Sequence, residues 1–132
     1  NLNAKLSTTL YAPFSATIDR VTGNLVIDIP SFIPLNMVNA PSGATHFRIS
    51  SAGTEIDFEG NFYAVDVQGT IDLPWDNAPT TAITLTQVVT PASIHPLFLV
   101  LGIDFSQQVN GSMYPLKNGA FNALSLVKVD GQ

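Results

Sequence analysis

The chain has 132 residues and no cysteine, and only 11% of its residues are charged, with a formal net charge of −5 at pH 7. This length suits one domain with its own core, and the lack of cysteine excludes disulfides, thiolate catalysis and cysteine-bound zinc. Nucleic acid is not expected as a partner, because phosphate binding needs clustered lysine and arginine and the five basic residues are scattered.

The first ten residues alternate between apolar and polar side chains. This period of two predicts a half-buried strand over residues 2–10, with Leu2, Ala4, Leu6 and Leu10 on its apolar side. A regular strand at a chain terminus is a ready donor to the sheet edge of another subunit, so these four residues are candidates for assembly. The alternative is an ordinary first strand that completes the chain's own fold.

Short strands separated by turn residues fill most of the remaining chain. Asn110-Gly111 is the strongest hairpin signal, because a type I′ turn needs positive φ at both central positions. Residues 97–105 are apolar on both faces, which predicts a central strand covered on both sides. No segment has the 3.6-residue apolar period of a long helix.

These strands predict an all-β fold with one domain over residues 1–132. The favoured architecture is an antiparallel β-sandwich, immunoglobulin-like or jelly-roll-like, and the alternative is a closed β-barrel. No apolar run approaches the ~20 residues of a membrane-spanning helix, so no transmembrane segment is expected.

The connection over residues 30–43 is irregular and unusually apolar, with one short helical turn expected near residues 35–39. It either covers an open end of the core or docks into a neighbouring subunit. The residues that would dock are Phe32, Ile33, Leu35, Met37 and Val38.

Three acidic residues, Glu55, Asp57 and Glu59, alternate with Ile56 and Phe58 after a turn expected at residues 51–53. The pattern predicts a strand with its acids on a solvated face and its apolar side chains turned inward. Contact with an ion or a partner and a catalytic carboxylate pair are the alternatives.

The chain has two histidines, His46 and His95, and lacks the G-x-S-x-G motif of many hydrolases. A serine hydrolase needs a base within reach of its nucleophile, and a metal would need carboxylates at a paired spacing that is missing. We therefore expect no enzymatic activity, no catalytic residue, no metal site and no cofactor.

Aromatic residues suggest a second function, a carbohydrate- or ligand-binding module. Its candidate residues are Tyr63, Trp75 and Asp76, because tyrosine and tryptophan rings form platforms for ligands with apolar faces. The competing interpretation of Trp75 is a plug that caps one end of a sandwich.

Four stretches carry a resemblance to known sequences: TLYAPF at residues 9–14, IDFE at 56–59, HPLFL at 95–99 and YPLKNGAFNAL at 114–124. They resemble the C-terminal, β-rich part of a group of uncharacterised proteins from Bacteroidota. That group has no established activity, so the resemblance implies no catalytic or ligand residue. It implies that a basic, more helical region precedes Asn1, and that the chain is the C-terminal part of a longer precursor.

The function expected from these features is that of a non-enzymatic structural or protein-interaction domain. The low charge, the terminal strand and the apolar connection favour a subunit of a homomeric assembly, such as a filament, shell or surface layer. The expected partner is then another copy of the protein. The compartment is left open, with an extracellular or particle-surface location favoured.

Overall fold

The computed structural model describes residues 6–116 and 123–131. In this part the chain is all-β, with antiparallel sheets and only two helices, each of four residues. The elements are α1 Leu6–Thr9, β1 Ser15–Asp19, β2 Asn24–Ile29, α2 Pro34–Met37, β3 His46–Asp57, β4 Phe62–Gly69, β5 Leu73–Pro74, β6 Ile83–Val88, β7 Leu97–Val109, β8 Ser112–Pro115 and β9 Ala123–Asp130.

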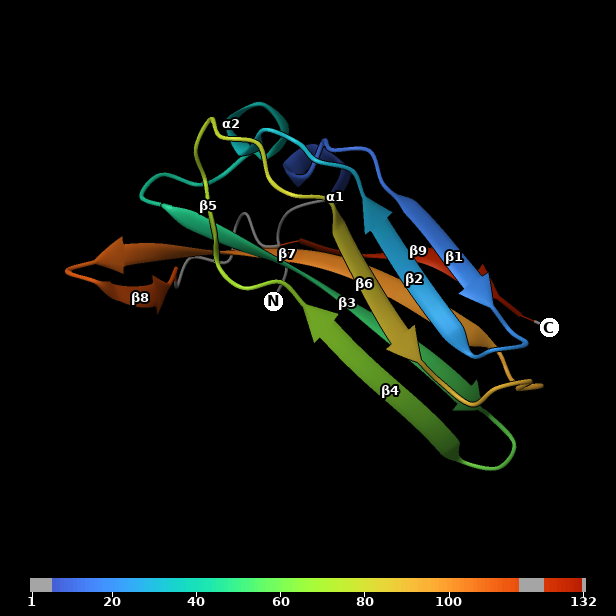
Figure 1. The fold of residues 1–132 in the computed structure, drawn as a ribbon. Helices are drawn as coiled ribbons and strands as arrows, with labels where there is room; N and C mark the ends of the chain where they lie inside the picture. The colour runs from blue at the N-terminus through green and yellow to red at the C-terminus, as the bar shows by residue number, and fades with distance from the viewer. Residues whose placement is uncertain (1–5, 117–122, 132) are drawn as a thin grey trace.

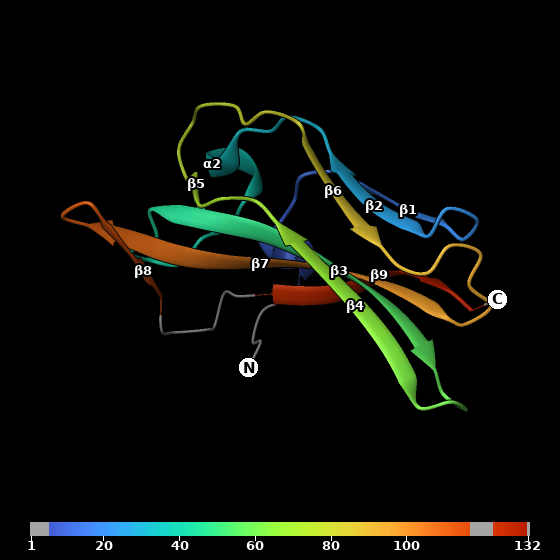
Figure 2. The same cartoon turned by 60° about the horizontal axis from the view of Figure 1, so that its bottom comes forward.

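The strands form two sheets. The smaller sheet has the order β1-β2-β6, and the larger, six-stranded sheet has the order β4-β3-β7-β8, with β5 paired to β3 and β9 paired to β7. Figures 1 and 2 both show β1, β2 and β6 together on one side of the larger sheet. No pairing joins the two sheets among the described strands, so the fold is the predicted antiparallel β-sandwich and not the closed barrel.

The core lies between the two sheets and is built by alternate residues of the central strands. Leu25 and Ile27 of β2 and Leu97, Leu99 and Leu101 of β7 are all fully buried. This period of two is the pattern of a sheet with one face on a core. The burial of these large aliphatic side chains is the main source of stability in a domain without disulfides.

Gly53 sets the close approach of the two sheets. A Cβ atom built on this glycine would lie 2.8 Å from Gln87 Cβ and 3.2 Å from Leu25 Cδ2, so a larger residue would push the smaller sheet away. The predicted turn at residues 51–53 is therefore wrong: β3 runs straight through it, and the glycine serves packing between sheets. Its inward neighbour Ser51 is hydrogen-bonded to the buried amide of Gln87.

The N-terminal strand prediction is wrong over residues 6–9, which form α1. The N–H of Leu10 donates to the Leu6 carbonyl at 2.8 Å, which closes a helical turn. That turn brings Leu6, Thr9 and Leu10, at the i, i+3, i+4 spacing of one helix face, into the core. Leu2 and Ala4 lie outside the described residues.

Turn chemistry was predicted more accurately. Asn110 and Gly111 have φ values of 51° and 82°, which confirms the type I′ signal between β7 and β8. Gly23 has φ of 80° in the β1–β2 turn, and Asn61 has φ of 57° between β3 and β4. In each case the residue is one that adopts positive φ at low cost.

Candidate functional site

The face of the larger sheet that points away from the smaller sheet is the main functional candidate. It is called the outer face below. The central strand β7 alternates between buried residues that face the core and half-buried residues, Phe98 and Val100, on the outer face. Both faces of this strand are apolar, as predicted, but the described chain covers only one of them.

The register of the sheet continues this largely apolar surface across β4, β3, β7 and β9. Val65 of β4 lies opposite Thr54 of β3, which lies opposite Phe98 of β7 and, through it, Val129 of β9. The next row is Val67, Ala52, Val100 and Leu126. Residues directly opposite each other on paired strands point to the same side, so these two rows lie next to each other on the outer face.

Six large apolar side chains on this face are strongly exposed, and we call them the outer patch. They are Tyr63 at 71%, Val65 at 51%, Val67 at 63%, Leu124 at 53%, Leu126 at 52% and Val129 at 48% of full exposure. Together they present on the order of 500 Å² of apolar surface, given the areas that such side chains bury. This area is comparable with the largest apolar patch of a typical soluble monomer, and such patches often have a function.

The two apolar rows hold no charged residue. Of the residues that the structure describes, the nearest charges on the outer face are Arg48 and Asp104, which lie opposite each other two rows beyond Ala52 and form an ion pair of 3.2 Å. The row between this ion pair and the apolar rows contains Gly102. A Cβ on this glycine would lie 2.8 Å from Leu124 Cδ1. Leu124 therefore lies flat over the sheet, and the patch ends at a neutralised pair of charges.

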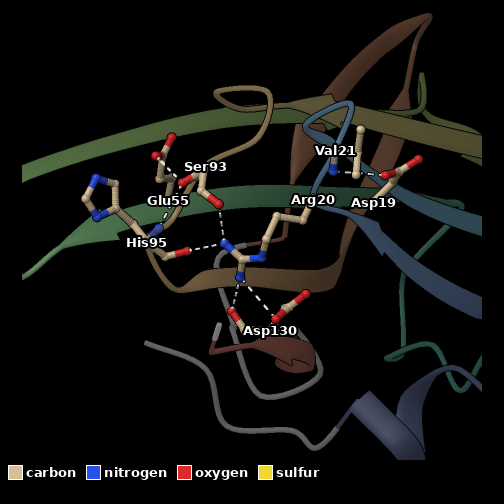
Figure 3. A network of polar contacts seen from close by, with 7 residues as sticks. All are labelled: Asp19, Arg20, Val21, Glu55, Ser93, His95 and Asp130. Atoms are coloured by element: carbon tan, nitrogen blue, oxygen red, sulfur yellow. Dashed lines mark hydrogen bonds and ion pairs between the residues drawn. The ribbon is translucent and has the colours of Figure 1, made fainter.

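A polar network at the other side of β3 is the second candidate (Figure 3). Its centre is Glu55, whose predicted position on a solvated face is wrong: it faces the core and is 1% exposed. The Ser93 hydroxyl donates to Glu55 Oε2 at 2.5 Å, and the Thr90 N–H donates to Oε1 at 3.3 Å. Phe58, predicted to point inward, is 69% exposed instead.

The pKa of Glu55 reflects two opposing effects. Burial raises the pKa of this carboxyl, because it removes water from the charged form. The hydrogen bonds from Ser93 and Thr90, together with the charge of His95, outweigh burial and lower the pKa below its ordinary value. Glu55 is therefore a buried carboxylate that is ionised at neutral pH.

Arg20, in the turn after β1, joins the network from the opposite side (Figure 3). Its guanidinium donates to the carbonyls of Ser93 at 2.8 Å, His95 at 2.7 Å and Asp130 at 2.9 Å. It also forms an ion pair of 3.0 Å with the Asp130 carboxylate. One side chain thus ties the β6–β7 connection and the end of β9 to the β1–β2 turn.

The geometry of this network does not resemble that of an activated nucleophile. Ser93 is buried and donates its proton to Glu55, while the bond between His95 and Ser93 comes from the histidine main chain. The imidazole Nε2 of His95 lies 3.8 Å from Asp57 Oδ2 and is directed elsewhere. A catalytic serine needs the opposite arrangement, with the ring nitrogen accepting the hydroxyl proton. What the network does is hold a connection in place.

Replacing Glu55 with glutamine should change the pH dependence of stability. Because the pKa of Glu55 is lower in the folded than in the unfolded chain, the carboxylate stabilises the fold fully at any pH above its ordinary, unfolded pKa. This contribution is lost as the pH falls through the folded pKa. We expect Glu55→Gln to be less stable by about 1–2 kcal/mol at pH 7 and to differ less from the unmodified chain at acidic pH.

Urea unfolding at a series of pH values measures this effect. Glu59→Gln, on the exposed turn after β3, is the matched control and should follow the unmodified chain throughout. A deficit of Glu55→Gln that stays constant or grows on acidification would contradict the role given to the buried carboxylate.

The other predicted assembly residues lie largely inside the chain's own core. Leu6 and Leu10 are buried, and Leu10 forms an isolated bridge with Val38. Within the apolar connection Phe32 and Val38 are buried, Ile33 and Met37 are half-buried, and Leu35 is 47% exposed. The connection therefore mainly covers an end of the core, which was one of the two predicted roles.

The predicted ligand-binding residues do not form one site. Tyr63 lies opposite Ile56, whereas Pro74, next to Trp75, lies opposite His46, ten positions earlier on β3. At about 3.3 Å per residue the two aromatic residues are thus about 33 Å apart along the strand. Trp75 is half-buried and its Nε1–H donates to the Val38 carbonyl at 3.0 Å, which agrees with a plug, and Asp76 is also half-buried.

Most of the outer patch was missed as a site, although Tyr63 was singled out for another reason. The signal that could have found it is the combination of residues 97–105, apolar on both faces, with alternating strands that place a second set of valines and leucines on the same side. The sequence does not show which strands pair, and only this pairing places the valines and leucines side by side on one face.

No three histidine or acidic side chains lie close enough to hold a metal ion within residues 6–116 and 123–131. In the same part of the chain, neither helix has the length and apolar character needed to cross a bilayer. These findings concern the described residues alone.

Comparison of the chain with models of protein families, with curated proteins and with solved structures gives no match. The resemblance to the Bacteroidota group therefore stays a prediction.

Proposed function

We propose that this chain is a non-enzymatic protein-interaction domain that forms a homomeric assembly through the outer patch. The observation that carries the proposal is the apolar face of the larger sheet, which residues 6–116 and 123–131 leave open, with six side chains between 48% and 71% exposed. Water contact with this surface is unfavourable, at roughly 25 cal/mol for each Å² of apolar area. A partner that covers the face would remove this cost.

The properties of the surface favour a second copy of the chain as the partner. The net charge of −5 on each copy opposes self-association, but the two apolar rows hold no charge and so add no repulsion within the contact itself. An apolar patch is also complementary to itself, which a two-fold contact requires. Two patches would bury about 1,000 Å² in total, near the lower size limit of specific interfaces.

Face-to-face packing of two sheets is a geometry that β-proteins already use for their cores, with the sheets about 10 Å apart. One two-fold contact of this kind produces a dimer. A filament, shell or surface layer needs a second contact, for which Leu35 in the connection and the N-terminal residues Leu2 and Ala4 remain candidates.

Light scattering coupled to size-exclusion chromatography tests the proposal. We expect a mass above the 14.1 kDa of one chain, rising with concentration, with a dissociation constant on the order of micromolar. A mass of one chain at every concentration up to about 1 mM would overturn the assembly proposal, because such an affinity lies below that of a specific interface.

A further inference from the structure

A hollow of about 410 Å³ lies at the end of the sandwich opposite to Tyr63, where the segment after α1, the helix α2 and the residue after β5 meet. Two aromatic side chains line it, Tyr11 at 54% exposure and the half-buried Trp75. Two carboxamides, Asn36 and Asn39, line the same hollow and are exposed. The hollow thus collects residues from three separate parts of the chain.

Main-chain hydrogen bonds hold these three parts in fixed positions. Tyr11 N–H donates to the Met37 carbonyl at 2.6 Å, and Asn39 N–H donates to the Thr9 carbonyl at 2.8 Å. The Trp75 ring is held by its bond to the Val38 carbonyl.

The far side of the hollow is fixed in the same way. Trp75 N–H donates to the Thr45 carbonyl at 2.9 Å, and Leu35 N–H donates to the Asp76 carbonyl at 3.0 Å. A site formed by backbone that is already hydrogen-bonded loses little conformational entropy when a ligand binds.

The chemistry of the lining defines the class of ligand. No charged side chain lines the hollow, so an ionic ligand would find no counter-charge there. Aromatic rings favour a ligand with an apolar face, and the Asn36 carboxamide offers both a donor and an acceptor to hydroxyl groups at the edge of such a ligand. A pyranose ring combines an apolar C–H face with a rim of hydroxyls.

We propose that this hollow is a binding site for neutral saccharides. It is separate from the outer patch, and the two proposals stand or fall independently. Tyr11 would provide the exposed aromatic face and Asn36 the hydroxyl contacts, with Trp75 forming the floor.

Trp75 is the only tryptophan of the chain, so its fluorescence reports on this hollow alone. The experiment titrates the protein with four neutral oligosaccharides, cellohexaose, laminarihexaose, mannohexaose and xylohexaose. We expect at least one to give a saturable change, with a dissociation constant on the order of 0.1–1 mM, as is usual for an open site that buries little of its ligand. Tyr11→Ala and Asn36→Ala should each weaken that binding about tenfold.

Tyr114→Ala is the matched control, because Tyr114 is exposed to the same 54% on β8 and does not line the hollow. It should bind like the unmodified chain. The proposal is overturned if none of the four oligosaccharides gives a saturable response, or if both Tyr11→Ala and Asn36→Ala bind with unchanged affinity. Circular dichroism checks that each variant is folded. If Tyr11→Ala does not fold, the affinity of Asn36→Ala alone tests the saccharide site.

Discussion

Replacing both Val65 and Leu126 with lysine is expected to leave a folded chain that no longer assembles. Both side chains belong to the outer patch, on the edge strands β4 and β9, and are about half exposed. The substitutions remove apolar contact worth about 1 kcal/mol each and place positive charges in a desolvated contact of two like surfaces. We expect the dissociation constant to rise by at least about a hundredfold.

The control is lysine at Thr17 and Thr86, which are exposed on the smaller sheet, on the opposite side of the sandwich. This variant makes the same change in net charge. It should keep the mass of the unmodified assembly in light scattering. Equal assembly of the two double variants would contradict the role of the outer patch.

Replacing Arg20 with methionine should lower the free energy of unfolding more than the same replacement of any other basic residue in the described chain. The substitution keeps an unbranched stem like that of arginine but removes the guanidinium, and with it the donors to the carbonyls of Ser93, His95 and Asp130. Because the Arg20 side chain is only 16% exposed, water replaces these donors poorly. We expect the free energy of unfolding to fall by about 2–4 kcal/mol.

Arg48→Met is the matched control for this prediction. Arg48 forms an ion pair with Asp104, but its side chain is 50% exposed, and exposed ion pairs contribute at most about 1 kcal/mol. Chemical denaturation of both variants measures the difference. A loss for Arg20→Met no greater than that for Arg48→Met would contradict the bridging role of Arg20.

The sequence was sufficient to predict the fold class, because strand periodicity and turn residues act locally. Asn110-Gly111 specifies its hairpin through the φ values of two adjacent residues, and no distant contact is needed. The helical turn at residues 6–9 was missed because Leu6 and Leu10 fit both a period of two and an i, i+4 spacing.

The error in the orientation of β3 has a different cause. An acidic residue on a strand is normally solvated, and Glu55 is buried only because Ser93 and Thr90, about 38 and 35 positions away, supply hydrogen bonds. A glycine in a sequence is typical of a turn, so the pattern predicts one at residues 51–53. The actual reason for Gly53 is the close approach of Gln87 from the other sheet, which exists only in the folded chain. Interactions of this range leave no trace in a local pattern.

The candidate sites were predicted less well than the fold. The two apolar faces of residues 97–105 correctly indicated that β7 is central, but a sequence pattern cannot say whether the second face is covered by the chain itself or by a partner. Similarly, Tyr11 and Trp75 are 64 positions apart, and they come together only because both segments are hydrogen-bonded to residues 37–39 in the folded chain.

The most direct test of assembly through the outer patch measures whether this patch is covered in solution. The chain has no cysteine, so Val65→Cys and Thr86→Cys each carry a single reactive thiol, on opposite sides of the sandwich. Their rates of reaction with a maleimide are compared between dilute and concentrated protein. If copies of the chain meet through the outer patch, Val65→Cys should react at least about tenfold more slowly when concentrated, while Thr86→Cys should be unaffected. A Val65→Cys thiol that reacts at the same rate at every concentration would contradict the proposed assembly.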